Sequence, residues 1–251
     1  MKIEIISCLK DNYSYVIIDE KNKKTCVVDP SESKPIVNFL EKNNLKLNYI
    51  LNTHHHYDHV GGNSELKKKY RAKIVGFEGD YKRIPEIDIM LKDGEIWKKD
   101  NFEAKIIHIP GHTLGHICFY FYNENNLFTG DTLFSLGCGR IFEGTYEQML
   151  NSLNLLKTFP EHTKIYCGHE YTLKNSEFCL KNDKENLKLK EKIILIKEKL
   201  SHGTPTIPTT LKEELECNIF LRSDNKLIQK NLNTLNELDT FSKLRDLKDI
   251  F

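Results

Sequence analysis

The chain has 251 residues, of which 39% are hydrophobic and 29% are charged, a composition typical of a globular protein with one large domain or one domain and a smaller partner. Its 37 basic and 36 acidic residues leave a formal net charge of +1, so neither a nucleic-acid nor a membrane partner is expected. No apolar run approaches membrane-spanning length, and the polar N-terminus does not resemble a secretory or transit signal, so we expect a cytoplasmic protein.

Seven cysteines are present, an odd number, and no two of them form a Cys-x-x-Cys pair. This pattern argues against a disulfide framework and against a zinc site built from thiolates. We therefore expect the cysteines to be buried free thiols in a reducing compartment.

Short strands alternate with helices through the first two-thirds of the chain. Apolar runs and alternation predict strands at residues 3–5, 13–18, 25–28, 49–52, 73–77, 102–109, 117–122, 127–129 and 164–167. The spacing of apolar and charged residues predicts helices at residues 34–42, 64–71 and 146–159. The polar turn at residues 123–126 predicts a hairpin between its two flanking strands. Together these elements are typical of stacked sheets with helices on the outside.

The chain beyond residue 172 has a helical pattern instead. In the segment 185–200, four apolar residues recur at helical spacing between lysines and glutamates: Leu189, Ile193, Ile196 and Leu200. The spacing of a capping box begins at Thr210, and a final amphipathic helix is predicted over residues 238–250. We therefore predict one domain of strands and helices at residues 1–172 and one all-helical domain at residues 173–251.

A cluster of potential metal ligands follows the predicted strand at 49–52. In an extended segment, residues i and i+2 share a face, so His54 and His56 reach one ion together. Where the chain turns toward a Gly-Gly pair, Asp58 and His59 swing to a second ion nearby. A histidine run without context is more often a solvated tract; the spacing His-x-His-x-Asp-His after a buried strand favours metal binding.

Three more candidate ligands each follow a strand and a glycine: His112, Asp131 and His169. The glycine lets the backbone turn and approach a site closely. Any one of the three alone is a weak signal, but together with the cluster they predict a site for two metal ions. The neighbouring His55 and His116 are expected to be structural, His55 as a packed or hydrogen-bonded side chain that points away from the metals.

The run from Thr53 to Gly62 resembles the signature of the metallo-β-lactamase superfamily. The resemblance implies an α+β fold, a four-layer αββα sandwich of two packed β-sheets with helices outside, followed here by a C-terminal all-helical domain. It also implies the ligand sets: His54, His56 and His112 for the first metal, Asp58, His59 and His169 for the second, and Asp131 bridging both. This set of nitrogen and oxygen donors suits two divalent ions, with zinc expected first and iron or manganese as alternatives.

Other segments resemble a narrower family, the hydroxyacylglutathione hydrolases, or glyoxalase II. The similar segments are Gly137–Thr145, Cys167–Thr172 and Asn218–Arg222, and the resemblance as a whole covers nearly the whole chain, including the helical extension. On the last helix, Arg245 and Lys248 share a face. Their spacing alone favours solvated surface charges, but they match the family's glutathione-binding Arg-x-x-Lys, which implies clamps for the carboxylates of glutathione.

The resemblance implies further substrate contacts at Arg140 and Tyr171. Phe142 stands where many relatives have a tyrosine, which removes one hydroxyl from the implied glutathione pocket. One hydrogen bond contributes about 0.5–1.5 kcal/mol, so we expect a modest loss of affinity or a larger share of recognition for Tyr171 and Arg140.

The implied reaction is the hydrolysis of S-D-lactoylglutathione and related 2-hydroxyacylglutathione thioesters to D-lactate and glutathione, the second step of methylglyoxal detoxification. A hydroxide bridging two metals would attack the thioester carbonyl. Asp58 would ligate a metal and orient or accept a proton, and the metal-binding side chains that share catalysis with it are His54, His56, His59 and Asp131. We expect a monomer whose partner is a glutathione thioester.

Three other interpretations remain open. A persulfide dioxygenase resembles this chain in the first motif, but it works with a single iron and lacks so long a helical extension. The Arg-x-x-Lys helix argues against a lactonase or another hydrolase of the superfamily. Seven filled ligand positions argue against a non-catalytic metal-binding scaffold. Metal counting, oxygen uptake and a thioesterase assay separate these interpretations.

Overall fold

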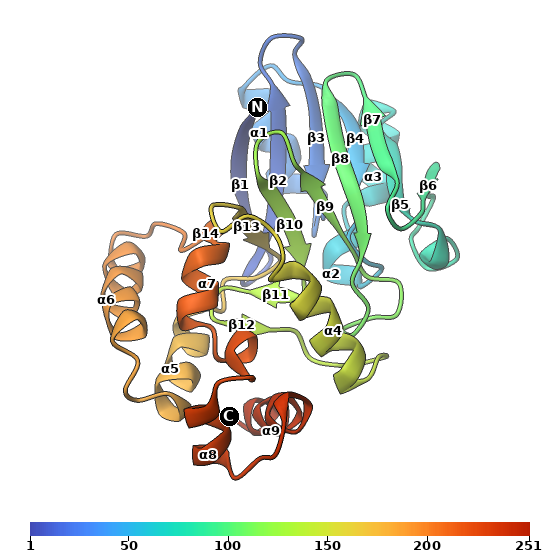
Figure 1. The fold of residues 1–251 in the computed structure, drawn as a ribbon. Helices are drawn as coiled ribbons and strands as arrows, with labels where there is room; N and C mark the ends of the chain where they lie inside the picture. Colours follow the sequence, from blue (N-terminus) through green and yellow to red (C-terminus); the bar gives the residue numbers. More distant parts are fainter. The chain divides into compact units, whose positions relative to one another are not determined.

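A computed structural model describes all 251 residues (Figure 1), and the chain divides into two compact units. The first unit consists of Met1–His108 and Gly115–Gly130, and the second of Ile109–Leu114 and Asp131–Phe251. The predicted boundary between the two domains, at residue 172, lies inside the second unit.

The first unit contains a six-stranded sheet in sequential order. Its strands are β1 (Lys2–Cys8), β2 (Asn12–Asp19), β3 (Lys24–Val28), β4 (Leu47–Leu51), β5 (Lys73–Phe77) and β6 (Ile89–Leu91). The pairs β1–β2 and β2–β3 are antiparallel, and β3 to β6 are parallel. Parallel neighbours need a crossover connection, which α1 (Ser33–Lys42) and α3 (Asn63–Tyr70) provide. The strands predicted from residue 3 to residue 77 and both helices are therefore confirmed.

A second, antiparallel group of strands packs against this sheet. It comprises β7 (Ile96–Lys99), β8 (Phe102–His108), β9 (Ile117–Phe121) and β10 (Asn126–Gly130). The predicted hairpin joins β9 to β10, with Leu127 opposite Tyr120. Aromatic rings join the two sheets: the centroids of Tyr15 and Phe128 are 5.4 Å apart, and those of Tyr49 and Trp97 are 5.2 Å apart.

The helices α1 and α3 cover the other face of the first sheet. Ile36 and Leu40 of α1 and Leu66 of α3 are fully buried in one cluster with side chains of β2, β3 and β4. The apolar spacing that predicted these helices is therefore the spacing of their buried face. A short helix, α2 (Tyr57–Val60), lies within the histidine cluster.

The second unit is mainly helical. Its elements are β11 (Leu133–Phe134), β12 (Gly137–Cys138), α4 (Tyr146–Leu156), β13 (Lys164–Cys167), α5 (Thr172–Asn182), α6 (Leu187–Ser201), β14 (Thr209–Thr210), α7 (Leu211–Cys217), α8 (Lys226–Leu232) and α9 (Glu237–Asp249). The predicted capping box at Thr210 is present, with Glu213 as its partner. The helices α5 and α8 were not predicted. In α5, Asn175 and Ser176 are buried beside Phe178, so the helix lacks a purely apolar face that its sequence pattern could show.

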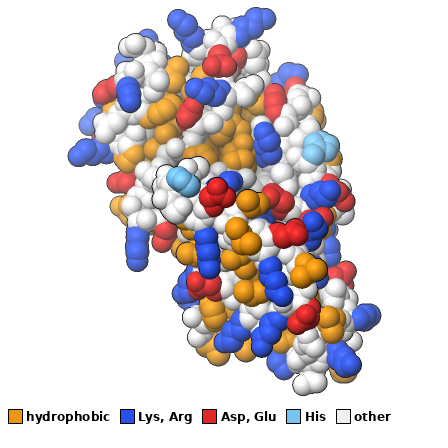
Figure 2. Space-filling view, turned by 90° about the vertical axis from the view of Figure 1, so that its left-hand side faces the viewer, with side chains coloured by type: hydrophobic (Ala, Val, Ile, Leu, Met, Phe, Trp, Pro, Cys, Tyr) orange, Lys and Arg blue, Asp and Glu red, His pale blue; other side chains and the backbone are white.

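All seven cysteines are free and buried, as predicted. None of the helices combines the length and the apolar composition that a bilayer span requires. On the face drawn in Figure 2, acidic and basic side chains are interspersed with hydrophobic and uncharged ones, and no single sign of charge covers it.

Candidate metal centre and substrate pocket

The first unit holds four of the predicted ligands just after β4. His54 Nε2 and His56 Nδ1 lie 3.1 Å apart, so the two imidazoles face the same point. Asp58 Oδ2 lies 3.7 Å from His59 Nε2 and accepts a hydrogen bond of 3.0 Å from Asn12 Nδ2. Because α2 begins after His56, the chain turns there and presents Asp58 and His59 separately from the first two histidines.

Asp29 organises this cluster, and the sequence analysis did not single it out. Its buried carboxylate accepts hydrogen bonds from the Thr53 backbone N–H (2.7 Å) and the Thr53 hydroxyl (2.6 Å), and from His59 Nδ1 (3.0 Å). Since a carboxylate only accepts, His59 carries its proton on Nδ1 and directs the Nε2 lone pair toward Asp58. The signal in the sequence was an aspartate directly after the buried strand that ends in Val27-Val28.

The same logic fixes the tautomer of His54. The Thr53 hydroxyl donates to Asp29, so at 3.0 Å it accepts from His54 Nδ1–H. This leaves the Nε2 lone pair of His54 facing His56, as metal coordination requires.

His55 and His116 have the structural surroundings that were predicted for them. His55 Nδ1 lies 3.0 Å from the fully buried carboxylate of Asp80. The ring of His116 stacks on that of His54, with centroids 4.6 Å apart and an angle of 21° between the planes. Gly130 packs so tightly against this stack that an added Cβ would lie 2.8 Å from His116 Nε2, and its φ of +47° also favours glycine.

The second unit holds the other three predicted ligands. Asp131 Oδ2 lies 3.3 Å from His169 Nε2 and 3.6 Å from His112 Nε2, so one carboxylate oxygen stands between two imidazoles. His112 Nδ1 donates a 2.7 Å hydrogen bond to the Arg140 carbonyl, which directs its Nε2 lone pair toward Asp131. The ring of His169 stacks on Tyr171 at 4.7 Å.

Within each unit the donors fit divalent metal ions. Nitrogen lone pairs face carboxylate oxygens or one another, and protein groups hold the opposite ring nitrogens of His54, His59 and His112 as donors. Such a hydrogen-bonded outer shell is typical of histidines that ligate metals. The set contains imidazole and carboxylate without thiolate, which suits zinc, iron and manganese.

A cavity of about 390 Å³ in the second unit contains the predicted substrate-binding residues. The residues that line it are, in chain order, His112, Asp131, Phe134, Cys138, Gly139, Arg140, Phe142, Tyr171, Lys174, Asn175, Arg245 and Lys248. Two of the predicted ligands therefore share one cavity with all five predicted substrate contacts. Lys174 and Asn175, on α5, are additional lining residues that the sequence did not single out.

Arg245 is buried and bonded within the chain, although its spacing alone favoured a solvated surface charge. It is only 3% exposed, and its Nη1 donates to the Cys138 carbonyl at 2.8 Å. Its Nη2 pairs with Asp249 at 2.9 Å, and Asp249 also pairs with Arg140 at 3.3 Å. Arg245 thus holds the wall of the cavity, whereas the Arg140 side chain is 58% exposed.

Lys248 has different surroundings from Arg245. Its buried Nζ has no hydrogen-bond partner within the chain and lies 5.2 Å from the ring centroid of Phe178 and 5.0 Å from that of Phe251. Burial, together with the positive charges of Arg245 and Lys174, lowers the pKa of Lys248 to about 8. An ammonium that lines a cavity without a partner is suited to receive an anion.

Comparison with known proteins covers the whole chain. The sequence profile of the metallo-β-lactamase superfamily matches residues 10–169, and that of the hydroxyacylglutathione hydrolase C-terminus matches residues 170–251. A hydroxyacylglutathione hydrolase of Pelagibacter ubique is 63% identical over the full length of both chains. That of Methylococcus capsulatus is 42% identical and covers 100% of this chain and 99% of its own.

Solved structures show the same fold at lower identity. The B3 metallo-β-lactamase BLEG-1 superposes with a TM-score of 0.68 at 20% identity, over 88% of this chain and 99% of that one. ETHE1 from Myxococcus xanthus superposes with a TM-score of 0.69 at 21% identity, over 100% of this chain and 99% of that one. The predicted α+β fold is confirmed, and the chain belongs to the hydroxyacylglutathione hydrolases of the metallo-β-lactamase superfamily.

Proposed function

We propose that the chain hydrolyses S-D-lactoylglutathione, and related 2-hydroxyacylglutathione thioesters, as the second step of methylglyoxal detoxification. Its family makes it a thioester hydrolase that acts on hydroxyacylglutathione. The observation that carries the choice of substrate is the cavity in which Asp131 and His112 share a lining with Arg140 and Lys248. A metal-binding end and a cationic end in one cavity suit a thioester at one end and carboxylates at the other.

In this proposal the seven ligands form one dinuclear centre. One ion would be held by His54, His56 and His112, the other by Asp58, His59 and His169, and Asp131 would be a ligand of both. When bound, two divalent ions supply an activated water molecule and polarise a carbonyl oxygen. Zinc is the proposed metal, with iron or manganese as the alternatives that this donor set accepts. The proposed catalytic domain remains residues 1–172 and the proposed glutathione-binding domain residues 173–251.

The protein's own groups then orient substrate and protons. Asn12 holds the Asp58 carboxylate through a 3.0 Å hydrogen bond, which positions it to accept a proton. The departing glutathione sulfur is a thiol of pKa about 8.5, so it leaves as the thiolate without a strong general acid.

The glutathione portion lies along the second-unit cavity. Lys248 and the exposed Arg140 contact its carboxylates, and Tyr171, stacked on His169, offers a hydroxyl beside the metal end. Phe142 is 62% exposed and lies 5.2 Å from the His112 ring, where it offers only apolar contact to the substrate. Seven free, buried thiols support a reducing, cytoplasmic location, and the proposed state is a monomer.

A thioesterase assay with metal analysis on the same sample tests the proposal. We expect hydrolysis of S-D-lactoylglutathione, two metal ions per chain and no oxygen uptake. A single iron with oxygen consumption on a glutathione persulfide would instead show a dioxygenase. Two metals without thioester hydrolysis would contradict the proposed substrate and leave the metal centre standing.

The charge of Lys248 predicts a pH dependence of substrate affinity. Its pKa of about 8 means that the ammonium is present below that pH and lost above it. We therefore expect kcat/KM for an anionic glutathione thioester to fall as pH rises through about 8, because kcat/KM reports groups of the free enzyme. The K248R variant keeps its charge over this range and should lack the decline, while retaining wild-type dependence at lower pH. A decline of equal size in wild type and K248R would assign it to another group.

A further inference from the structure

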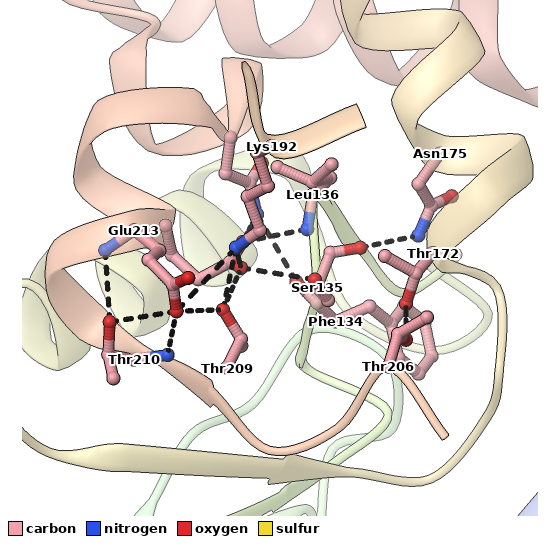
Figure 3. A network of polar contacts seen from close by, with 12 residues as sticks. Phe134, Ser135, Leu136, Thr172, Asn175, Lys192, Thr206, Thr209, Thr210 and Glu213 are labelled. Atoms are coloured by element: carbon pink, nitrogen blue, oxygen red, sulfur yellow. Dashed lines mark hydrogen bonds and ion pairs between the residues drawn. The ribbon is translucent and has the colours of Figure 1, made fainter. Parts of the chain in front are cut away.

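Glu214 of α7 is a fully buried carboxylate, at 0% exposure, that accepts five hydrogen bonds. Its Oε1 accepts from Lys192 Nζ at 2.9 Å, Thr209 Oγ1 at 2.7 Å and Ser135 Oγ at 3.2 Å. Its Oε2 accepts from the Leu136 backbone N–H at 2.7 Å and Asn218 Nδ2 at 3.1 Å. Dashed contacts from Lys192, Thr209 and Leu136 converge in the middle of Figure 3.

This network holds the tight turn between β11 and β12, residues 134–137. Leu136 adopts a left-handed φ of +58°, which is unfavourable for a leucine unless its surroundings impose it. Three side chains, two from α5 and one from the residue after α7, pair the backbone of the turn: Asn175 donates to the Ser135 carbonyl at 3.0 Å, Cys179 to the Leu136 carbonyl at 3.1 Å, and Asn218 to the Gly137 carbonyl at 3.0 Å. Glu214 supplies the acceptor for the Leu136 N–H.

The turn is continuous with one wall of the substrate cavity. Phe134, its first residue, and Cys138 and Gly139, which follow it, line the cavity, and Arg245 donates to the Cys138 carbonyl in the same wall. Gly139 packs so closely on the Asp131 carbonyl that an added Cβ would lie 1.9 Å from it. A shift of the turn would therefore move the wall on which the substrate rests.

We propose that Glu214 is a positioning residue of the substrate pocket: its carboxylate, held by Lys192, fixes the 134–137 turn and through it the wall that recognises glutathione. This inference rests on the proposed function for the identity of the ligand. Lys192 pairs with the carboxylate at 2.9 Å. Burial opposes the charged form of the lysine, but the carboxylates of Glu214 and Glu213 raise the pKa of Lys192, so its ammonium remains charged.

Glutamine at position 214 has the same shape but cannot serve both sets of donors. Each carboxylate oxygen accepts from at least two groups, whereas an amide offers one oxygen and one NH₂ donor. An amide nitrogen facing the Lys192 ammonium is the less favourable choice, so the amide oxygen should face Lys192. The NH₂ group then opposes the Leu136 N–H, and the bond that anchors the turn is lost.

The test compares E214Q with E213Q. Glu213 is the next residue on α7 and lies 3.9 Å from the same lysine, but its hydrogen bonds are to Thr209 and Thr210 and none reaches the turn. We expect E214Q to raise KM for S-D-lactoylglutathione about tenfold, with kcat changed less than about threefold and metal content unchanged. E213Q should keep KM within about twofold of wild type, because glutamine also serves at this capping-box position.

Hydrogen exchange at the Leu136 amide measures the anchor without any substrate. It should quicken by about tenfold or more in E214Q and stay as in wild type in E213Q. Equal exchange in the two variants, or a lower melting temperature in E214Q with an unchanged KM, would overturn the proposal. If the wild-type protein does not hydrolyse the thioester, the proposed function fails. Two measurements, hydrogen exchange at the Leu136 amide and the affinity of each variant for glutathione, then still decide the role of Glu214.

A second variant covers the case in which E214Q does not fold. K192M/E214M removes both charges of the buried pair and every side-chain acceptor at position 214, and such apolar replacements of a buried ion pair often leave stability intact. It lacks the same acceptor for Leu136, so the same rise in KM and the same faster exchange are expected. Wild-type values of both in the double variant would overturn the proposal.

Discussion

Replacement of Asp131 by alanine is expected to reduce kcat by on the order of 10³-fold or more and to lower the metal content of the purified protein. One oxygen of this carboxylate stands 3.3 Å from His169 Nε2 and 3.6 Å from His112 Nε2, so alanine removes the anion on which both imidazoles converge. Metal analysis and steady-state kinetics on S-D-lactoylglutathione measure the two effects.

A matched control for this variant is D224A. Asp224 belongs to the same unit, and its side chain is 61% exposed in a surface ion pair of 3.7 Å with Lys157. Such pairs contribute at most about 1 kcal/mol, so both metal content and kcat should match wild type. Full metal loading and turnover in D131A would show that Asp131 does not bind metal.

Replacement of Arg245 by alanine should affect both substrate binding and stability. Its guanidinium donates to the Cys138 carbonyl and pairs with Asp249, and it lies 5.2 Å from the ring centroid of Phe220. Truncating one partner of a buried charged hydrogen bond costs about 2 kcal/mol or more, so KM should rise about 30-fold or more. The same loss should lower the melting temperature by about 4–8 °C.

Lys248 provides the contrast on the same helix. Its Nζ is buried without a hydrogen-bond partner, so K248M should raise KM by about tenfold while the melting temperature stays the same or rises. Measuring KM and melting temperature for both variants separates a residue that contacts substrate from one that also holds the wall. An unchanged KM in R245A would remove the reason to assign glutathione to α9.

Local patterns explain how much of the fold could be predicted. The hydrophobic spacing of Ile36, Leu40 and Leu66 reflects the face that α1 and α3 bury, and the Thr210 capping box is a contact within three residues. By contrast, α5 packs with Asn175 and Ser176 inside, because Asn175 donates to the distant Ser135 carbonyl and the Ser176 hydroxyl donates to the Leu173 carbonyl of its own helix. An apolar periodicity cannot report a helix whose buried face is polar.

In the candidate site, too, only the local pattern could be predicted from the sequence. The spacing of His54, His56, Asp58 and His59 is a local signature of metal chemistry, and its residues lie together as expected. Asp29 and Glu214 carry no such signature, because each acts through partners distant in sequence: Asp29 on Thr53 and His59, Glu214 on Ser135 and Leu136. Arg245 was singled out only by its likeness to a family motif, which gave no hint of its bond to Cys138.

The buried cysteines bear on how this enzyme tolerates the oxidised form of glutathione, its thiol product. Burial raises the pKa of every one of the seven thiols, to about 12 for Cys167 and Cys179. Cys138 lines the cavity itself, and burial raises its pKa even though Arg245 beside it acts in the opposite direction. Only a thiolate attacks a disulfide, so these thiols exchange slowly with oxidised glutathione. The enzyme can therefore work in the presence of both forms of glutathione without forming mixed disulfides with it.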